Sequence, residues 1–478
     1  MEYIIKGRKP EKLFNYFEEI SAIPRGSGNE KGIADYIENF AKERGLSYHR
    51  DEANNLFVRI AATEGREAER AIMLQGHTDM VCEKNQDTVH DFEKEGIKLI
   101  LNGDLLTADG TTLGADNGVA VALMLAILDG ELKSHPAVEC LFTTGEEVGL
   151  DGAKAFDYSL VTADRMINLD SEGEGYATVS CAGGVRTDLT MTPTMVSIER
   201  TAMEVKLMGL AGGHSGVEIN CRRANANKLM GRILAALSSS VEFYLVDIEG
   251  GSKDNAIPRE CRVTIALDPN DIAAAEKILM AEAGAISAEL SEADKNMKLS
   301  VTPTVCEAHF DAIGTKNTVA LMASVANGVF SMSEDIKELV EYSRNFGVVY
   351  LENGTLRMIF SSRSSVESMI DHSQREMEIL GGALGFGVRH YSRYPGWSYS
   401  KESELREKYI DAAKKVLGCE PTILAIHAGL ECGIIKSHIP YMDMISIGPE
   451  MRDIHSPDEV LDLPSLERFW VLIEEMLK

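Results

Sequence analysis

Residues 71–79 read Ala-Ile-Met-Leu-Gln-Gly-His-Thr-Asp, a short apolar run that leads into a histidine and an aspartate. A run of this length is typical of a buried strand. A second run at 138–143 leads in the same way into a Glu-Glu pair, and the uniformly apolar residues 118–128 between them predict a buried helix. Strands that alternate with helices predict an α/β fold with a mixed, largely parallel sheet flanked by helices.

The chain of 478 residues is longer than one hydrophobic core usually supports, so we expect more than one domain. The pattern of the sequence changes near residue 186. Helices expected at 222–237 and 270–290, each among strands, are followed in a similar order by a second pair at 315–329 and 366–384. We interpret this recurrence as an internal duplication of a βαββαβ-type unit.

The α/β pattern returns from about residue 397, where a helix is expected at 402–417. The simplest arrangement is one α/β domain that a second domain interrupts. We therefore predict an α/β domain formed by residues 1–185 and 397–478, and an α+β lid domain at 186–396 made of two βαββαβ-type repeats.

The composition limits the partners of the protein. The chain carries 75 acidic and 48 basic side chains, a formal net charge of −27 that would repel nucleic acid and anionic membranes. Its eight cysteines form no CxxC pair, which favours free thiols in a reducing compartment. The N-terminus resembles no signal peptide, and the longest apolar run, 119–128, is too short to span a bilayer. These features predict a cytoplasmic protein.

Five side chains of the metal-binding type follow the predicted strands or begin the predicted buried helix. They are His77, Asp116, Glu147, Asp170 and His455. Each alone has an ordinary explanation, such as a helix N-cap for Asp116. Because sites in open α/β sheets lie at the carboxyl ends of the strands, we expect the five to converge. Two histidines and three carboxylates match the needs of two zinc ions, and a carboxylate can bridge ions roughly 3.5–4 Å apart.

The same stretches resemble the di-zinc peptidase and deacylase superfamily over essentially the whole chain. Its signature is a strand ending in His-x-Asp, a Gly-x-Asp at a helix start, a Glu-Glu pair, a later Asp and a C-terminal His, and all occur here in that order. Within the superfamily, residues 113–118 (Leu-Gly-Ala-Asp-Asn-Gly), the doubled lid and residues 427–433 (His-Ala-Gly-Leu-Glu-Cys-Gly) are most similar to the aminoacyl-histidine dipeptidases, also called peptidase D.

The resemblance implies a role for each metal-type side chain. His77 and Asp170 would bind one zinc ion, Glu147 and His455 would bind the other, and Asp116 would bridge the two. Imidazole and carboxylate sites of this kind also accept Mn²⁺ or Co²⁺. The implied cofactor is therefore a pair of Zn²⁺ ions, with Mn²⁺ or Co²⁺ as substitutes.

The resemblance also implies roles for neighbouring and lid residues. Asp79 would hydrogen-bond His77 and fix its tautomer, and Glu146 would be the general base that activates a bridging water. In the lid, His214 would stabilise the oxyanion, Asn255 would contact substrate, and Arg363 would hold the terminal carboxylate of the substrate.

Gly429 and Glu431 fall where the resemblance expects groups near the substrate, and Glu431 would pair with a free α-amine. Metal-dependent hydrolysis of dipeptides is thus implied, with β-alanyl-histidine as one substrate and a broader range beside it. The oligomeric state stays open between a monomer and a homodimer.

Two alternatives stay open at this point. The same metal site would suit an N-acyl-amino-acid deacylase or a carboxypeptidase that acts on longer chains. A non-catalytic metal-binding protein would keep the fold but would have little reason to retain a base at Glu146. Nucleotide hydrolysis and serine catalysis are disfavoured, because the sequence has neither a Walker loop nor a GxSxG motif.

Overall fold

The computed structural model describes residues 3–478, which form two compact units. Unit 1 contains the chain up to Cys181 together with Tyr399–Ala425 and Leu430–Lys478. Unit 2 contains Ala182–Ser398 and a short return segment, Ile426–Gly429. Within the described residues, no helix is long and apolar enough to span a membrane.

Unit 1 is built on an eight-stranded mixed sheet. In spatial order its strands are β1 (Ser47–Arg50), β2 (Leu56–Ile60), β6 (Val138–Thr143), β3 (Ile72–His77), β7 (Arg165–Asn168), β23 (Asp443–Ser446), β8 (Tyr176–Cys181) and β22 (Thr422–Ile426). The central strands β6, β3, β7 and β23 run parallel, and β2 and β8 join them in the antiparallel direction. The parallel strands therefore present their carboxyl ends along one edge of the sheet, as the sequence predicts.

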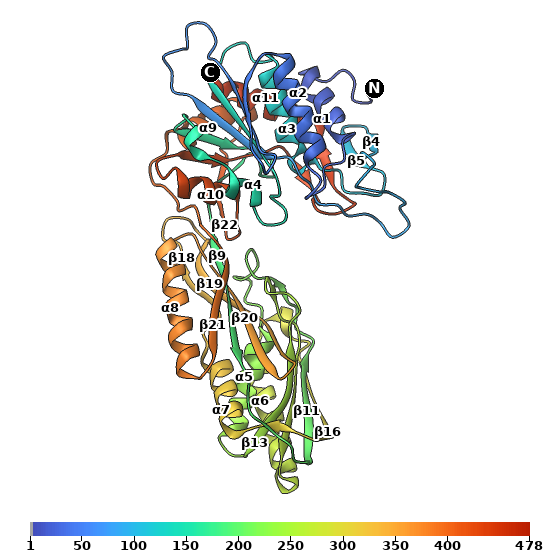
Figure 1. Cartoon of the computed structure of the whole chain (residues 1–478), viewed down its shortest axis with the longest axis vertical. Coiled ribbons are helices and arrows are strands. Elements are labelled where there is room, and N and C mark those ends of the chain that lie inside the picture. The colour runs from blue at the N-terminus through green and yellow to red at the C-terminus, as the bar shows by residue number, and fades with distance from the viewer. Residues whose placement is uncertain (1–2) are drawn as a thin grey trace. The chain divides into compact units, whose positions relative to one another are not determined.

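Helices cover this sheet and explain why its central strands are buried. They are α1 (Glu11–Ser21), α2 (Lys31–Glu43), α3 (Ala115–Leu128), α4 (Asp151–Ala155), α9 (Glu404–Leu417), α10 (Glu431–His438) and α11 (Leu463–Leu477). Every residue of α3 is buried, because α3 packs against α1 on one side and β3 on the other (Figure 1). A helix that is apolar all round requires such enclosure. The predicted mixed sheet flanked by helices is confirmed.

A small second sheet of unit 1 orders the loop that carries His455. Its strands are β24 (Met451–Arg452), β25 (Val460–Asp462), β5 (Leu105–Ala108) and β4 (Leu99–Asn102). The loop between β24 and β25 contains both His455 and Glu459, and His455 has a positive φ of 61° within it. The pairing of β25 with β5 anchors this C-terminal loop to the first part of the chain.

Unit 2 contains one large antiparallel sheet. In spatial order its strands are β16 (Lys298–Cys306), β11 (Arg200–Met208), β15 (Cys261–Leu267), β13 (Phe243–Gly250), β19 (Val340–Glu352), β20 (Thr355–Ser364), β9 (Gly183–Met191) and β21 (Gly387–Tyr394), with β18 (Gly328–Met332) paired to β19. Its helices are α5 (Ala226–Ser238), α6 (Ile272–Glu289), α7 (Ala312–Ser324) and α8 (Glu367–Ala383). One hydrophobic core joins all four helices to the sheet.

The two halves of this sheet have the same topology. Both halves follow the order strand, helix, strand, strand, helix, strand along the chain, β11-α5-β13-β15-α6-β16 in one and β9-α7-β19-β20-α8-β21 in the other, where β18 is an addition. Across the sheet the strands of each half lie in the same spatial order. This order is β13-β15-β11-β16 in one half and β19-β20-β9-β21 in the other. Strand β9 precedes every element of the half that runs from β11 to β16, and α7 follows that half. The β11–β16 half is therefore inserted into the other half, between β9 and α7.

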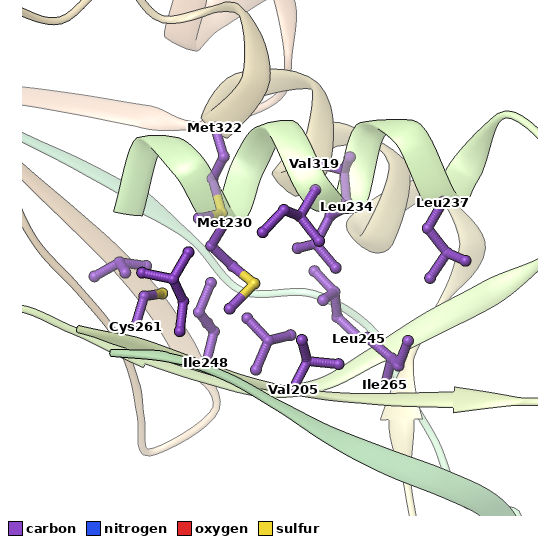
Figure 2. Packing of buried hydrophobic residues seen from close by; sticks show 14 of the residues in the cluster. Val205, Met230, Leu234, Leu237, Leu245, Ile248, Cys261, Ile265, Val319 and Met322 are labelled. Carbon is purple, nitrogen blue, oxygen red and sulfur yellow. The ribbon is translucent and has the colours of Figure 1, made fainter. Parts of the chain in front are cut away.

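The packing of α5 on the sheet shows how the repeat buries its apolar residues. Met230, Leu234 and Leu237 on α5 point down towards the strands below, which contribute Leu245 and Ile265 to the same cluster (Figure 2). All five side chains are fully buried. Burying a leucine or methionine side chain contributes about 1.5–3 kcal/mol, so this one interface stabilises unit 2 substantially.

Candidate metal centre and active site

His77 is the last residue of β3, and its ring faces two carboxylates. Its Nε2 atom lies 3.2 Å from Oδ1 of Asp116 and 3.2 Å from Oδ1 of Asp170. Asp116 is at the start of α3, and Asp170 follows β7, the neighbour of β3. His77 is 1% exposed. The adjacent carboxyl ends of β3 and β7 thus bring one imidazole and two carboxylates together.

His455 forms a second group of the same kind. Its Nε2 atom lies 3.1 Å from Oδ2 of Asp116 and 3.0 Å from Oε1 of Glu147. Asp116 therefore turns one carboxylate oxygen towards His77 and the other towards His455. In this arrangement the Asp116 carboxylate could bridge two ions, each of which would be completed by one histidine and one further acid.

The chemistry of this donor set fits two metal ions. Ligand atoms placed 2.0–2.2 Å from a tetrahedral zinc are roughly 3.3–3.6 Å apart, close to the separations of 3.0–3.2 Å found here. Oε1 of Glu147 is buried and faces Nε2 of His455, as the two ligands of one ion would. The carboxylates of Asp116 and Glu147, which accept hydrogen bonds from the His455 ring, raise the pKa of His455 to about 10, and this reflects the excess negative charge that bound cations would neutralise.

Asp79 organises the centre from behind His77. Its main-chain oxygen lies 3.1 Å and its Oδ1 atom 3.4 Å from Nδ1 of His77, so Nε2 is left for the ligand side. The carboxylate also accepts hydrogen bonds from the main-chain N–H groups of Glu146 and Glu147 and from the hydroxyl of Ser27. Although burial opposes ionisation, these contacts hold the pKa of Asp79 at about 2. Asp79 thus fixes both the histidine and the turn that carries the Glu-Glu pair.

Glu146 lies beside the ligands. Its carboxylate, that of Glu147 and the His77 ring offer atoms that all lie within 4.8 Å of one another. Burial, reinforced by the charges of Asp170, Glu431 and Glu147, raises the pKa of Glu146 well above its usual range, while His77 opposes the shift. A carboxylate in such surroundings has the proton affinity that a general base requires.

Two buried charges hold the loop that carries Asp116. Glu459 accepts hydrogen bonds from the main-chain N–H groups of four consecutive residues, 113–116, at 2.8–3.3 Å. Arg25 donates to the main-chain oxygens of Thr78, Asp79 and Gly114. Arg25 and Glu459 therefore bind the peptide groups on either side of Gly114. We call these two residues the Arg25–Glu459 clamp. A Cβ at position 114 would lie 2.6 Å from Nη2 of Arg25, so only glycine leaves room for the clamp.

A chain of hydrogen bonds crosses the strand ends beneath the ligands. Ser446 donates to Asn168, Asn168 donates to Gln75, and Gln75 donates to Glu431, which also accepts from Thr143 at 2.7 Å. Each donor points towards Glu431, whose side chain is fully buried and whose Oε1 atom has no hydrogen-bond partner within residues 3–478. Burial raises the pKa of Glu431 to about 7. The structure thus places Glu431 in the interior of unit 1.

The lid histidine of the sequence prediction lies in unit 2. The ring nitrogen Nδ1 of His214 accepts hydrogen bonds from the main-chain N–H groups of Gly216 and Val217, both at 3.2 Å. The hydrogen of the neutral ring must therefore be on Nε2. Burial, together with the charge of Arg363, lowers the pKa of His214. Asn255 precedes β14 (Ala256–Ile257), which pairs with β12 (Gly213–His214), and its main-chain oxygen accepts from Ser215.

Unit 2 also contains Arg363 and Gly429. Arg363 lies in β20, is 7% exposed and donates from Nη1 to the hydroxyl of Tyr394 at 2.9 Å. A Cβ at position 429 would lie 2.9 Å from Cε2 of the same tyrosine, so the glycine permits a close approach. The structure therefore gathers His77, Asp79, Asp116, Glu146, Glu147, Asp170, Glu431 and His455 in unit 1, and His214, Asn255, Arg363 and Gly429 in unit 2.

Sequence reasoning missed the residues that support these groups. Arg25, Glu459 and Tyr394 belong to no recognisable spacing pattern. One weak signal was present, because Gln75 and Asn168 each stand two residues before a predicted ligand at the end of a strand. A polar side chain at the end of an apolar strand is therefore worth testing as a support for the ligand that follows it.

Known peptidases resemble this chain in both sequence and fold. The profile of peptidase family M20/M25/M40 matches residues 73–478. The cytosol non-specific dipeptidase of Escherichia coli (strain K12) is 37% identical over 472 residues, which cover 98% of this chain and 97% of that protein. The crystal structure of aminoacylhistidine dipeptidase from Vibrio alginolyticus matches with a TM-score of 0.92 and 35% identity, over 98% of this chain and 96% of that one.

The aminopeptidase PepT of Bacillus cereus shares the fold, with a TM-score of 0.56 and 17% identity over 98% of this chain and 100% of that one. The range matched by the family profile contains all five metal-type side chains and the Glu-Glu pair. The profile covers most of the chain and the E. coli relative nearly all of it. On these matches, this chain belongs to peptidase family M20/M25/M40.

Proposed function

We propose that this metallopeptidase hydrolyses dipeptides with both ends free, including β-alanyl-histidine, with the aid of two zinc ions. The observation that carries the proposal is the orientation of the Asp116 carboxylate, which faces His77 with one oxygen and His455 with the other. The names of the E. coli and V. alginolyticus relatives support a dipeptide as the substrate. Mn²⁺ and Co²⁺ offer the same ligand preferences and would substitute.

In the proposed mechanism, His77, Asp116, Glu147, Asp170 and His455 would hold two zinc ions, which when bound would supply Lewis acidity for the scissile carbonyl and the attacking water. Glu146 takes a proton from that water and delivers it to the nitrogen of the leaving amino acid. Asp79 keeps His77 in the tautomer that presents Nε2, and it holds the main chain of Glu146 in place. The protein thus contributes orientation and, through Glu146, the relay of one proton from the water to the leaving nitrogen.

Residues of unit 2 complete the proposed mechanism. His214 would donate its Nε2 hydrogen to the oxygen that becomes negative, since its Nδ1 atom is already an acceptor. Arg363 would bind the terminal carboxylate, and Asn255 and Gly429 would contact the substrate beside it. The pairing of Glu431 with the α-amine stays a prediction, and the complete burial of that side chain makes it the least supported of these roles.

The experiment that tests the proposal combines metal analysis with a substrate panel. Purified protein should bind two Zn²⁺ per chain and hydrolyse β-alanyl-histidine, and N-acetylated β-alanyl-histidine should be cleaved far more slowly. Preference for the acetylated compound would support a deacylase instead, and release of single residues from longer peptides would support a carboxypeptidase. Two bound metal ions with no turnover of any substrate would contradict the proposed activity and would support a non-catalytic metal-binding protein.

We propose a cytoplasmic location as well. The name of the E. coli relative supports it, as do eight cysteines that are all free thiols. A homodimer also stays a prediction, and multi-angle light scattering of the purified protein at micromolar concentration would distinguish it from a monomer.

A further inference from the structure

Arg363 is a buried cation without a counter-charge. Its Nη1 donates to the neutral hydroxyl of Tyr394, its Nε is buried without any hydrogen-bond partner, and it forms no ion pair with any of residues 3–478. A guanidinium has five N–H donors, and a buried charge that lacks a partner is costly. Most of the donors of Arg363 are therefore available to an anionic ligand.

The strand register places Arg363 in a row across the sheet of unit 2. Arg363 of β20 is paired with Ser343 of β19 on one side and with Gly184 of β9 on the other, and Gly184 is paired with Tyr394 of β21. Residues opposite each other on neighbouring strands share a face of the sheet. A Cβ at position 184 would lie 2.7 Å from the hydroxyl oxygen of Tyr394, so the missing side chain lets the tyrosine extend across β9 to Arg363.

The return segment of unit 2 contacts both ends of this row. Nε2 of His427 lies 2.7 Å from the hydroxyl oxygen of Ser343, and the neighbouring Gly429 packs against the ring of Tyr394. Nδ1 of His427 is buried and has no hydrogen-bond partner within the described chain. When Ser343 donates to Nε2, the hydrogen of the neutral ring is on Nδ1 and is available to a ligand.

The charges in this row are compatible with a single anion. Burial, with the positive charge of Arg363, lowers the pKa of His427 to about 3, so the imidazole is neutral at physiological pH. It therefore adds a donor without adding a second cation that would repel Arg363. The hydroxyl of Tyr394 accepts from Arg363, and its own hydrogen is consequently free to be donated elsewhere.

We propose that Tyr394 and His427 join Arg363 in binding the C-terminal carboxylate of the substrate and set the preference for a free carboxylate over an amide. This inference rests on the proposed dipeptidase function. A carboxylate has two oxygens and about four lone-pair sites, which suit the guanidinium, the phenol hydroxyl and the imidazole N–H together. A C-terminal amide would direct its NH₂ group at one of these donors and leave that donor unpaired.

The test uses the zinc-loaded protein with a dipeptide and its C-terminal amide. The unmodified protein should favour the free acid roughly 100-fold or more in kcat/KM. Tyr394→Phe should raise KM for the acid roughly tenfold with kcat nearly unchanged, and should leave the amide unaffected. Tyr391→Phe, in the same strand, is the matched control and should alter neither substrate.

His427 provides an independent arm of the test. His427→Ala should reduce the ratio of acid to amide in the same way, and His427→Asn should restore part of it, because an amide nitrogen can donate near the position of Nδ1. If Tyr394→Phe raises KM for acid and amide alike, or leaves the ratio at its original value, the inference is wrong while the dipeptidase proposal stands. If the unmodified protein hydrolyses neither substrate, the proposed function fails and this inference fails with it.

Discussion

Asp116 connects both halves of the metal centre, because each of its two carboxylate oxygens faces a different histidine. Asp116→Asn removes the negative charge and one of the two acceptor oxygens. We expect the zinc content after dialysis to fall from two ions per chain to one or fewer, and kcat to fall by several orders of magnitude. Inductively coupled plasma mass spectrometry checks the first result and a dipeptide assay the second.

A matched control for this substitution is Asp87→Asn, which changes an exposed aspartate and should leave both quantities unaltered. Retention of two tightly bound ions by Asp116→Asn would contradict the bridging role.

Substitutions of the adjacent residues Glu146 and Glu147 should have different effects, one on proton transfer and the other on metal binding. Glu146→Ala removes a base but no proposed ligand, so the protein should keep both zinc ions while kcat falls roughly 10²–10⁴-fold. Glu147→Ala removes the partner of His455 and should lower the zinc content. Metal analysis and turnover measured on the same samples distinguish the two variants. Near-normal turnover of metal-loaded Glu146→Ala would remove Glu146 from the mechanism.

Among the elements, the loop before α3 depends on the Arg25–Glu459 clamp. Glu459→Ala leaves four main-chain N–H groups without their acceptor, and each buried unpaired group costs about 1–3 kcal/mol. We expect the free energy of unfolding to fall by roughly 4 kcal/mol or more. Because the same loop carries Asp116, the Kd for Zn²⁺ should rise and the visible spectrum of the Co²⁺-loaded protein should change.

Chemical denaturation and competition with a chromophoric chelator measure these two effects. Glu467→Ala, which removes a carboxylate that pairs with Arg8, is the control on the same C-terminal segment. An unchanged Kd and Co²⁺ spectrum in Glu459→Ala would show that the clamp serves stability alone.

Three helices of unit 1 meet at one ionised side chain, Asp129, at the end of α3. It pairs with Lys12 of α1 and with Arg44 at the end of α2, and it accepts from the hydroxyl of Tyr16. Although burial opposes ionisation, Arg44, Lys12 and Tyr16 hold the pKa of Asp129 at about 2. An unfolded aspartate has a pKa of about 3.9, so the folded state favours the charged form.

Asp129→Asn should therefore destabilise the protein at pH 7, by about 1 kcal/mol because solvent screens these partly exposed ion pairs. The contribution of Asp129 is fully present above pH 4 and is lost as the pH falls through 2, because the carboxyl group is then protonated in the folded state as well as in the unfolded one. The difference in unfolding free energy between the two proteins should accordingly shrink between pH 4 and pH 2. A difference that is constant over this range would show that the ion pairs do not set the stability at this junction.

At the scale of the whole molecule, the metal-type side chains all lie in unit 1, and unit 2 has a hydrophobic core of its own. Removal of the metals by a chelator should abolish turnover and lower the melting temperature of unit 1, since a ligand at 1,000 times its Kd stabilises by about 4 kcal/mol. The transition of unit 2 should stay in place. Zn²⁺, Mn²⁺ or Co²⁺ should restore both properties, and calorimetry with a parallel activity assay measures them. Full activity of the metal-free protein would contradict the metal-dependent mechanism.

The parts of the molecule that could be predicted are those that leave a local pattern. Apolar strands that end in His77, Glu147 and Asp170 are visible in the sequence, because burial and ligation fall on neighbouring residues. The Arg25–Glu459 clamp leaves no such pattern, since its partners are main-chain groups, which every residue possesses. The insertion of one repeat within the other could not be predicted either, because the order of elements along the chain does not determine which strands pair.

That insertion has a consequence for the synthesis of the protein. Strand β9 leaves the ribosome early, but both of its neighbours, β20 and β21, lie beyond the entire first half of the sheet. At about 5–20 residues per second, β9 waits on the order of ten seconds or longer with neither edge paired, while the intervening half completes its own core. An unpaired strand is a template for aggregation. During translation, β9 is therefore a segment of unit 2 that we expect to need protection by a chaperone.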